Sequence, residues 1–348
     1  MHPVSIVVLN YNYARYLHRS VGSALSQSLS DVQVIVVDDC STDESREVIS
    51  QFGDRVTRVF RQKNGGHGAA INSGFARAEG ELVVFLDADD YLYPHAARRL
   101  FENKKSGVVQ YQYRLDLVDA IERIVDSYPP RELRWQDGDV TGHLLSRGRY
   151  LTTVTSGLAF DRAKARMFMP MDPEAFRQGG DGYLVTIAPL YGEVKTIDEP
   201  LGAYRQHGRN HSQFGNLVAA RARWRLEHDE HRLAALRQHA SRLGLVCNGK
   251  AWRHDLGHLE ERAASLVLDP SRHPAPSETR AAIADWALAA VHSLPASKRR
   301  RWITRVWWLV VGFGPAWAAR SAIVWKLHAP SRPALVRYMA RAARRLTA

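Results

Sequence analysis

The chain has 348 residues, of which 45% are hydrophobic and 24% charged, so it is long enough for more than one domain with a buried core. Its two cysteines, Cys40 and Cys247, exclude a disulfide framework and a cysteine-rich zinc site and favour a reducing cytoplasm. The formal net charge of +12 lies beyond Asp285, because residues 286–348 contain twelve Lys and Arg and no Asp or Glu. No basic segment or cleavage site of a signal peptide is expected at the N-terminus.

Strands and helices are predicted to alternate through the first hundred residues. Apolar runs predict buried parallel strands, at Val4–Leu9, Val32–Val37, Val56–Phe60 and Leu82–Leu86. Helical spacing and capping residues predict the helices, at Ala14–Ser26, from Ser41 to Phe52 and from about Ala69 to Ala78. This alternation indicates a parallel α/β sheet with right-handed crossovers.

Polar residues follow three of these strands. They are Asn10, Tyr11 and Asn12 after the first strand, Asp38 and Asp39 after the second, and Asp87, Asp89 and Asp90 after the fourth. Ligands of open α/β folds bind at this carboxyl edge. Three carboxylates within four positions repel one another unless a cation is present, and Mg²⁺ and Mn²⁺ take oxygen ligands. For an isolated acid cluster, the alternative is a turn or a helix cap.

A glycine-rich loop, Gly65-Gly66-His67-Gly68, opens the third helix at the same edge. Glycines before a helix let backbone N–H groups approach a phosphate. The loop is neither a dinucleotide-binding G-x-G-x-x-G nor a P-loop, because no Gly-Lys-Ser/Thr ends it. A tight turn and a phosphate cradle both remain open.

Four stretches match, in order and spacing, the motifs of the family 2 glycosyltransferases, which have the GT-A fold. They are Val4–Asn12, Val36–Asp43, Asn64–Gly74 and Leu86–Asp90. The resemblance covers roughly residues 3–215 and implies a GT-A-like α/β fold, a nucleotide-binding parallel-rich sheet with flanking helices. In residues 1–215, about 1–110 would bind the nucleotide and 111–215 the acceptor.

The resemblance also implies roles for the residues that match its motifs. Tyr11 would lie beside the nucleotide base, and Asp39, with Asp38 its neighbour, would accept a hydrogen bond from the base. Asp87 and Asp89 match the D-x-D that binds the ribose and the metal-bridged diphosphate, with Asp90 as an alternative metal ligand to Asp89. The other expected donor-binding residues are Asn10, Asn64, Gly65, Asn72 and Arg205.

The second half of this region is expected to carry the catalytic base. Thr155–Phe160 looks like the acceptor-side strand of the family, and Asp181, in a glycine-flanked loop, matches the position of its catalytic acid. Inverting transfer needs one carboxylate to deprotonate the acceptor hydroxyl, and a cation, Mn²⁺ or Mg²⁺, to neutralise the leaving diphosphate. The alternative is an exposed loop aspartate.

A motif similar to the one that closes the family's catalytic core follows at Tyr204–Ser212. By this resemblance His207 would be a third metal ligand, and Arg205 or Arg209 would contact the diphosphate bidentately. The alternative is a surface loop with incidental basic residues.

Beyond the core, residues 216–292 are predicted to form a helical extension and residues 293–348 a basic, Trp-rich tail. Fourteen uncharged residues, including Trp307 and Trp308, separate Arg305 from Arg320. That is fewer than the ~20 needed to span a bilayer, and Gly312–Pro315 would break a helix there. A helix lying in an anionic membrane interface fits better. A packed helical hairpin is the alternative, and the clustered Trp residues argue against nucleic-acid binding.

These features together predict an inverting, metal-dependent glycosyltransferase on the cytoplasmic face of the membrane. It would move a sugar from a nucleotide-diphosphate sugar to a hydroxyl of a lipid-linked or growing polysaccharide, as is common for this family in bacterial cell-envelope assembly. The alternative is a non-catalytic sugar-nucleotide-binding or scaffolding protein at the membrane, which would be free to lose the acids and Asp181.

Overall fold

The computed structural model describes residues 2–207, 218–292 and 296–327. Contacts divide the chain into two compact units. The first is Met1–Asn210 with His231–Cys247, and the second is His211–Glu230 with Asn248–Ala348. The boundary at residue 215 stays a prediction, and helix α8 (Val218–Arg242) contributes residues to both units.

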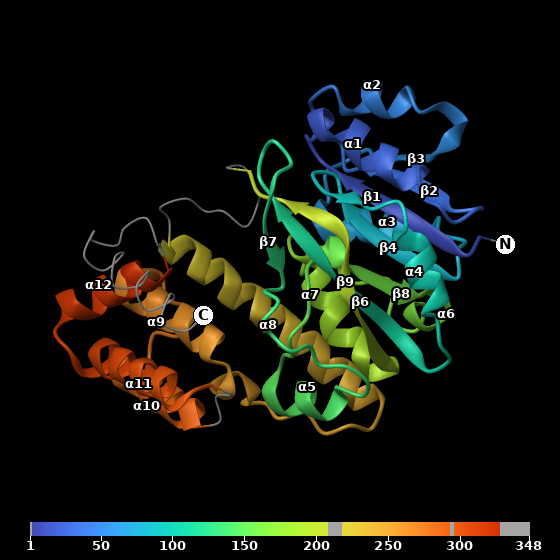
Figure 1. Cartoon of the computed structure of the whole chain (residues 1–348). Helices are drawn as coiled ribbons and strands as arrows, with labels where there is room; N and C mark the ends of the chain where they lie inside the picture. The colour runs from blue at the N-terminus through green and yellow to red at the C-terminus, as the bar shows by residue number, and fades with distance from the viewer. Residues whose placement is uncertain (1, 208–217, 293–295, 328–348) are drawn as a thin grey trace. The chain divides into compact units, whose positions relative to one another are not determined.

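The first unit is built on a mixed sheet of nine strands in the described part of the chain (Figure 1). The strands are β1 (Val4–Asn10), β2 (Gln33–Asp38), β3 (Thr57–Phe60), β4 (Leu82–Asp87), β5 (Tyr91–Leu92), β6 (Val108–Val118), β7 (Ile124–Tyr128), β8 (Leu158–Asp161) and β9 (Glu193–Arg205). Their order is β3-β2-β1-β4-β8-β6-β9-β5, and β7 pairs with β6. The four strands predicted from the sequence are confirmed and pair in parallel, and β6 and β9 form a second parallel pair. β8 joins β4 antiparallel.

Helices connect these strands. They are α1 (Ala14–Leu25), α2 (Ser45–Ser50), α3 (Gly66–Phe75), α4 (Ala96–Glu102), α5 (Thr141–Arg147), α6 (Arg162–Ala165) and α7 (Gly180–Ile187). The helix predicted from Ser41 is shorter, because the Asp43 carboxylate accepts hydrogen bonds from the amide and hydroxyl of Ser45 and holds a turn before α2. Helix α3 begins at Gly66, earlier than expected, and the predicted strand Thr155–Phe160 is a 3₁₀ turn followed by β8.

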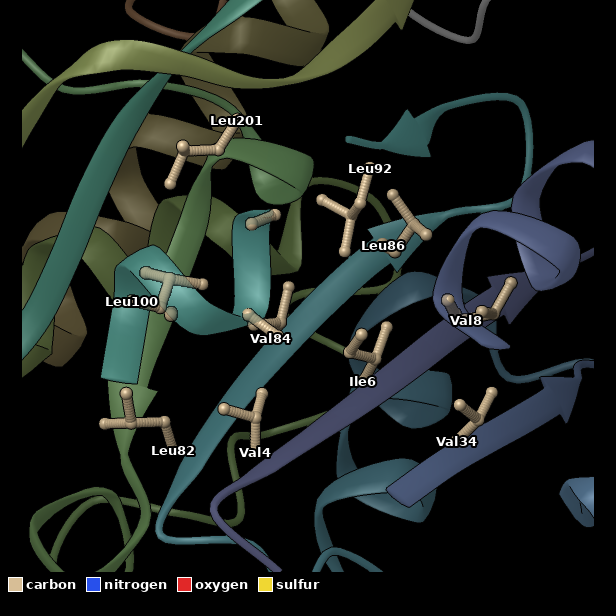
Figure 2. Close-up of a cluster of buried hydrophobic side chains, with 14 of the residues drawn as sticks. Val4, Ile6, Val8, Val34, Leu82, Val84, Leu86, Leu92, Leu100 and Leu201 are labelled. Carbon is tan, nitrogen blue, oxygen red and sulfur yellow. The ribbon is translucent and has the colours of Figure 1, made fainter. Parts of the chain in front are cut away.

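Alternate residues of the central strands form the main core (Figure 2). They are Val4, Ile6 and Val8 of β1, Val34 of β2, and Leu82, Val84 and Leu86 of β4. Successive side chains of a strand point to opposite faces, so these residues share one face of the sheet. Leu92, Leu100 and Leu201 pack against it. The side chains on both faces of β1, β2 and β4 are buried, and each strand ends where its polar residues begin.

The opposite face of the sheet is covered by α3. A Cβ on Gly74 would lie 2.2 Å from Val7 Cγ1 and 3.2 Å from Val37 Cγ2. Glycine therefore allows the helix backbone to approach β1 closely, and this approach sets where the helix begins at the sheet edge.

The second unit contains α9 (Leu256–Leu268), α10 (Arg280–His292), α11 (Lys298–Phe313) and α12 (Ala316–Leu327), with the first half of α8. The predicted helix break is confirmed between Phe313 and Ala316. Trp308 is buried in a core with residues of α9 and α10, so part of the apolar segment packs as a hairpin instead of facing a membrane. No helix among the described residues combines the length and apolarity needed to cross a bilayer.

Gly74→Ala is expected to lower the free energy of unfolding by about 1–3 kcal/mol, because the added methyl group overpacks the α3–β1 contact. Gly22→Ala in α1 is the matched control, since its Cβ would meet no atom within 4 Å. This control should be neutral or stabilising by about 0.5–1 kcal/mol. Urea unfolding followed by far-UV circular dichroism distinguishes the two, and equal stability of both variants would contradict the packing argument.

Candidate functional site

The polar strand ends meet at one edge of the sheet, as predicted. Asn10 lies opposite Asp38 in the β1–β2 register, and Leu9 lies opposite Asp87 in the β1–β4 register. The parallel strands therefore bring the residues after β1, β2 and β4 together.

The first two strand ends are tied to each other by buried side chains. Asn10 Nδ2 donates to Asp38 Oδ1 at 2.9 Å and to Ser41 Oγ at 3.1 Å, and the Ser41 amide donates to Asp38 Oδ2 at 3.1 Å. Asn10 and Asp38, both predicted to bind the donor, thus shape the loop after β2. Tyr11, in contrast, is 36% exposed in the loop after β1.

Asp39 connects the end of β2 to the glycine-rich loop. Its carboxylate accepts from the amides of Gly65, at 3.0 Å, and Gly66, at 2.6 Å, and Arg61 Nε lies 2.8 Å from Oδ1. A buried carboxylate with three such partners holds the entrance of α3 in place.

The four backbone amides from Gly65 to Gly68 all donate to protein acceptors. The first two donate to Asp39, the third to the Arg177 carbonyl and the fourth to the Phe176 carbonyl. Of the two interpretations left open, the tight turn therefore fits the structure. The phosphate cradle does not, because its donors are already used.

Two further predicted donor-binding residues bind the chain itself. Asn72 Nδ2 donates to the Met171 carbonyl at 2.8 Å, and its Oδ1 accepts from the Met171 amide at 3.1 Å. Asn64 Nδ2 donates to the Asp39 carbonyl, and its Oδ1 accepts from Arg177 at 2.6 Å. Both asparagines fasten the segment that precedes α7 to the entrance of α3.

A pocket of about 340 Å³ opens beside the entrance of α3. It is lined by Arg61, Lys63, Asn64, Gly65, Ala69, Asn72, Ser73, Pro173 and Glu174. The lining includes three predicted donor-binding residues but none of the acids at the end of β4, so the acid cluster lies outside it.

Asp90 is the most buried of the three acids after β4, with 1% of its surface exposed. Its Oδ2 accepts from Ser156 Oγ at 2.6 Å, and its Oδ1 accepts from the Arg205 amide at 2.9 Å. Burial, and then the charges of Asp89 and Asp87, raise the pKa of Asp90 well above its ordinary range. Both oxygens serve the fold, in contrast to the predicted role as an alternative metal ligand.

Asp89 lies beside His207. Its Oδ2 is 3.0 Å from His207 Nε2, and the imidazole stacks on the Tyr16 ring at 5.1 Å between centroids. His207, the predicted third metal ligand, thus contacts Asp89, one of the three acids after β4. Tyr13 lies in the same corner, with its ring centre 5.7 Å from that of His207. Burial, and then the charges of Asp89 and Asp87, raise the pKa of its hydroxyl.

The Arg205 guanidinium is buried, in contrast to the predicted contact with a diphosphate. Nη2 binds Glu122 at 2.7 Å, Nε donates to the Asp89 carbonyl at 2.9 Å, and the group lies 5.1 Å from the centre of the Tyr16 ring. Arg205 therefore holds the backbone of the acid cluster. Arg209 lies outside the described residues.

Asp181 lies in the first turn of α7, so the predicted loop is a helix. Gly179 before it has a left-handed backbone with φ of 69° and supplies no side chain to cap the helix. A carboxylate in the first turn is favoured by the helix dipole.

His67 is a site residue that the sequence reasoning missed. Its Nδ1 accepts from the Gly180 amide at 3.0 Å, and its Nε2 lies 3.3 Å from Asp87 Oδ1. Burial lowers the pKa of His67, but Asp87 and then the charges of Asp181 and Asp39 raise it, and the net shift is upward. The only sequence signal was a titratable ring among glycines at a strand–helix junction.

The carboxylates of Asp87 and Asp89 suit a cation that is shared with phosphate oxygens. No group of three or more His, Cys, Asp or Glu residues forms a complete metal site among the residues that the structure describes. Mg²⁺ and Mn²⁺ beside phosphates are commonly held by one or two carboxylates, with phosphate and water oxygens as the other ligands. The acid pair after β4 meets this requirement.

Known proteins with similar sequences carry related names. Residues 5–132 match the family described as Glycosyl transferase family 2. An uncharacterised glycosyltransferase of Nostoc sp. is 39% identical over 213 residues, which are 60% of this chain and 66% of that protein. The succinoglycan biosynthesis protein ExoO of Rhizobium meliloti is 35% identical over 132 residues, 37% of this chain and 38% of its own length. The chain thus spans just under two thirds of the first of these relatives and less of the second.

Solved structures share the fold at low sequence identity. Staphylococcus aureus TarS 1–349, crystallised with UDP, aligns with a TM-score of 0.52 and 16% identity over 94% of this chain and 91% of that one. The mannosyltransferase PcManGT of Pyrobaculum calidifontis, crystallised with GDP-Man and Mn²⁺, aligns with a TM-score of 0.51 and 16% identity over 93% and 87%. Residues 5–132 therefore belong to the family 2 glycosyltransferases, and the chain has the GT-A fold of its structural neighbours.

Proposed function

We propose that this protein is an inverting, metal-dependent glycosyltransferase that uses a nucleotide-diphosphate sugar. The observation that carries the proposal is the convergence of Asp87 and Asp89 after β4 with Asp181 in the first turn of α7, linked through the His67 ring. The rival is a sugar-nucleotide-binding scaffold, which needs neither a base nor a metal site. Metal-dependent turnover of one nucleotide sugar from a panel decides between them.

The donor binds across the strand ends in this proposal. Tyr11 is exposed where a nucleotide base would lie, and the Asp87 carboxylate, which contacts His67, would face the ribose. Asn10, Asp38 and Asp39, with Asn64 and Asn72, would position the loops around them. Two structural neighbours, crystallised with UDP and with GDP-Man, support a nucleotide diphosphate as the donor class.

Asp89 and Asp87 would hold Mn²⁺ or Mg²⁺ together with the diphosphate oxygens. When bound, this cation would neutralise the charge of the leaving nucleoside diphosphate. His207 Nε2 lies 3.0 Å from Asp89 Oδ2, so the ring would orient that carboxylate and lie next to the bound cation.

Asp89→Asn is expected to weaken Mn²⁺ binding, measured in the presence of UDP or GDP. The loss should exceed the roughly 10- to 100-fold that removal of a residue supporting a metal ligand costs, because Asp89 would bind the ion itself. Asp90→Asn is the matched control. Both Asp90 oxygens bind the chain, and an asparagine oxygen still accepts from the Arg205 amide, so Mn²⁺ affinity should fall much less than in Asp89→Asn. Titration of free Mn²⁺ by electron paramagnetic resonance measures both. A larger loss in Asp90→Asn than in Asp89→Asn would reverse the assignment.

Asp181 would remove the proton from the acceptor hydroxyl as it attacks the anomeric carbon. Asp181→Asn should bind the nucleotide sugar nearly normally but transfer about 10²- to 10⁴-fold more slowly, because it keeps the shape and loses the base. Steady-state kinetics separates kcat from KM, and NMR of the fresh product should show inversion. Near-wild-type kcat would move the role to another carboxylate, and retention would contradict the mechanism.

The acceptor would be a lipid-linked or growing polysaccharide, reached from the cytoplasmic face of the membrane. The name of the Rhizobium relative supports polysaccharide synthesis. The surface of α11 supports the location: Trp302, Val306, Leu309 and Phe313 recur every three or four residues and are all exposed. Lys298, Arg299 and Arg300 begin the same helix and are exposed as well. An apolar face beside cations suits an interface of anionic lipid.

Full-length protein should sediment with phosphatidylserine vesicles and less at high salt, because each cation near the surface contributes about 1 kcal/mol. Leu309→Glu with Phe313→Glu should abolish sedimentation, since both side chains are about half exposed. Val246→Glu is the control, because Val246 is 89% exposed and belongs to the first unit, not to α11. If the variant with Leu309→Glu and Phe313→Glu sediments as wild type does, or if wild type does not sediment, the support for a membrane location is lost.

A further inference from the structure

His67 occupies a position that no role in donor binding, metal binding or base catalysis explains. Its ring stands between two elements of the proposed site, the end of β4 and the beginning of α7. Nδ1 faces Gly180, one residue before Asp181, and Nε2 faces Asp87.

The Gly180 contact satisfies a specific need of α7. The first amides of a helix have no acceptor within the helix, and the residue before α7 is Gly179, which has no side chain to offer one. The His67 imidazole supplies the missing acceptor from another part of the chain. Because an amide can only donate, the Nδ1 that it meets is unprotonated and the ring hydrogen is on Nε2. Nε2 lies 3.3 Å from Asp87 Oδ1, which is an ion-pair contact without the alignment of a hydrogen bond.

The backbone around the ring is held by close packing. A Cβ on Gly66 would lie 2.2 Å from the Arg177 carbonyl oxygen, and one on Gly68 would lie 2.6 Å from the Phe176 carbonyl oxygen. The amide of His67 itself donates to the Arg177 carbonyl at 2.7 Å. The segment before α7 thus lies against the entrance of α3, so the ring has little freedom to leave either contact.

We propose that His67 is a positioning residue that couples the donor end of the site to the helix that carries the base. One arm of the ring sets the direction of the Asp87 carboxylate, and the other fixes the first turn of α7. This inference rests on the proposed function for the roles of Asp87 and Asp181, while the two contacts stand on their own.

Three substitutions in the full chain separate the two arms. His67→Asn places an oxygen the same number of bonds from Cα as Nδ1, so it can keep the Gly180 contact and lose the Asp87 contact. His67→Gln places an amide nitrogen the same number of bonds from Cα as Nε2, so it can keep the Asp87 contact and lose the other. His67→Ala loses both.

Two measurements report on the Gly180 contact and the Asp87 contact separately, and neither requires enzyme turnover. Hydrogen exchange of the peptide that contains Gly180 should become about 2- to 10-fold faster in His67→Gln and His67→Ala, and stay near wild type in His67→Asn. Binding of UDP or GDP with Mn²⁺, measured by calorimetry, should weaken roughly 10- to 100-fold in His67→Asn and His67→Ala, but little in His67→Gln.

The outcomes are distinct. Unchanged exchange and unchanged affinity in His67→Ala would overturn the proposal, and so would equal loss of both properties in all three variants, which is the pattern of a ring that only fills space. If wild type binds neither nucleotide with Mn²⁺, the proposed function fails and the coupling with it. The exchange pattern would then still report the contact between His67 and α7.

Discussion

The structure depends on how three like charges are accommodated at the end of one buried strand. Asp87, Asp89 and Asp90 follow β4 within four positions, where burial strengthens their mutual repulsion. Each carboxylate has a different partner. Asp90 is buried and hydrogen-bonded to the chain, Asp89 lies against His207, and Asp87 lies against His67. This division leaves two carboxylates at the sheet edge that can share a cation with a diphosphate.

The partners of these acids come from distant parts of the chain, and that links the site to the fold. His67 begins α3, Ser156 precedes β8, and His207 follows β9. The loops at this edge of the sheet are tied in a similar way, since Asn72 and Asn64 bind the segment that leads to α7. A shift of α3 along the sheet would therefore disturb the acid cluster and α7 together. Gly74, whose missing Cβ allows α3 to lie on β1, sets that register.

The sequence predicted the sheet edge well, because apolar runs and the residues that end them are local features. The strands that end at Asn10, Asp38 and Asp87 are confirmed, and so is the helix break near Gly314. The direction of each side chain was not predictable, because it depends on partners far along the chain. Asn72 meets Met171 and Arg205 meets Glu122, contacts that no local motif encodes. His67 was missed for the same reason: both of its partners lie outside its own motif. In the second unit, Trp308 is buried by packing between helices that periodicity alone could not orient.

We propose that a divalent cation and a nucleotide diphosphate meet at the end of β4. Anomalous diffraction at the manganese edge tests it most directly, on crystals grown with Mn²⁺ and either UDP or GDP. We expect one strong anomalous peak within coordination distance of the Asp89 carboxylate, with diphosphate density beside it and the base near Tyr11. A peak at Asp90, or nucleotide density away from the ends of β1, β2 and β4, would contradict it.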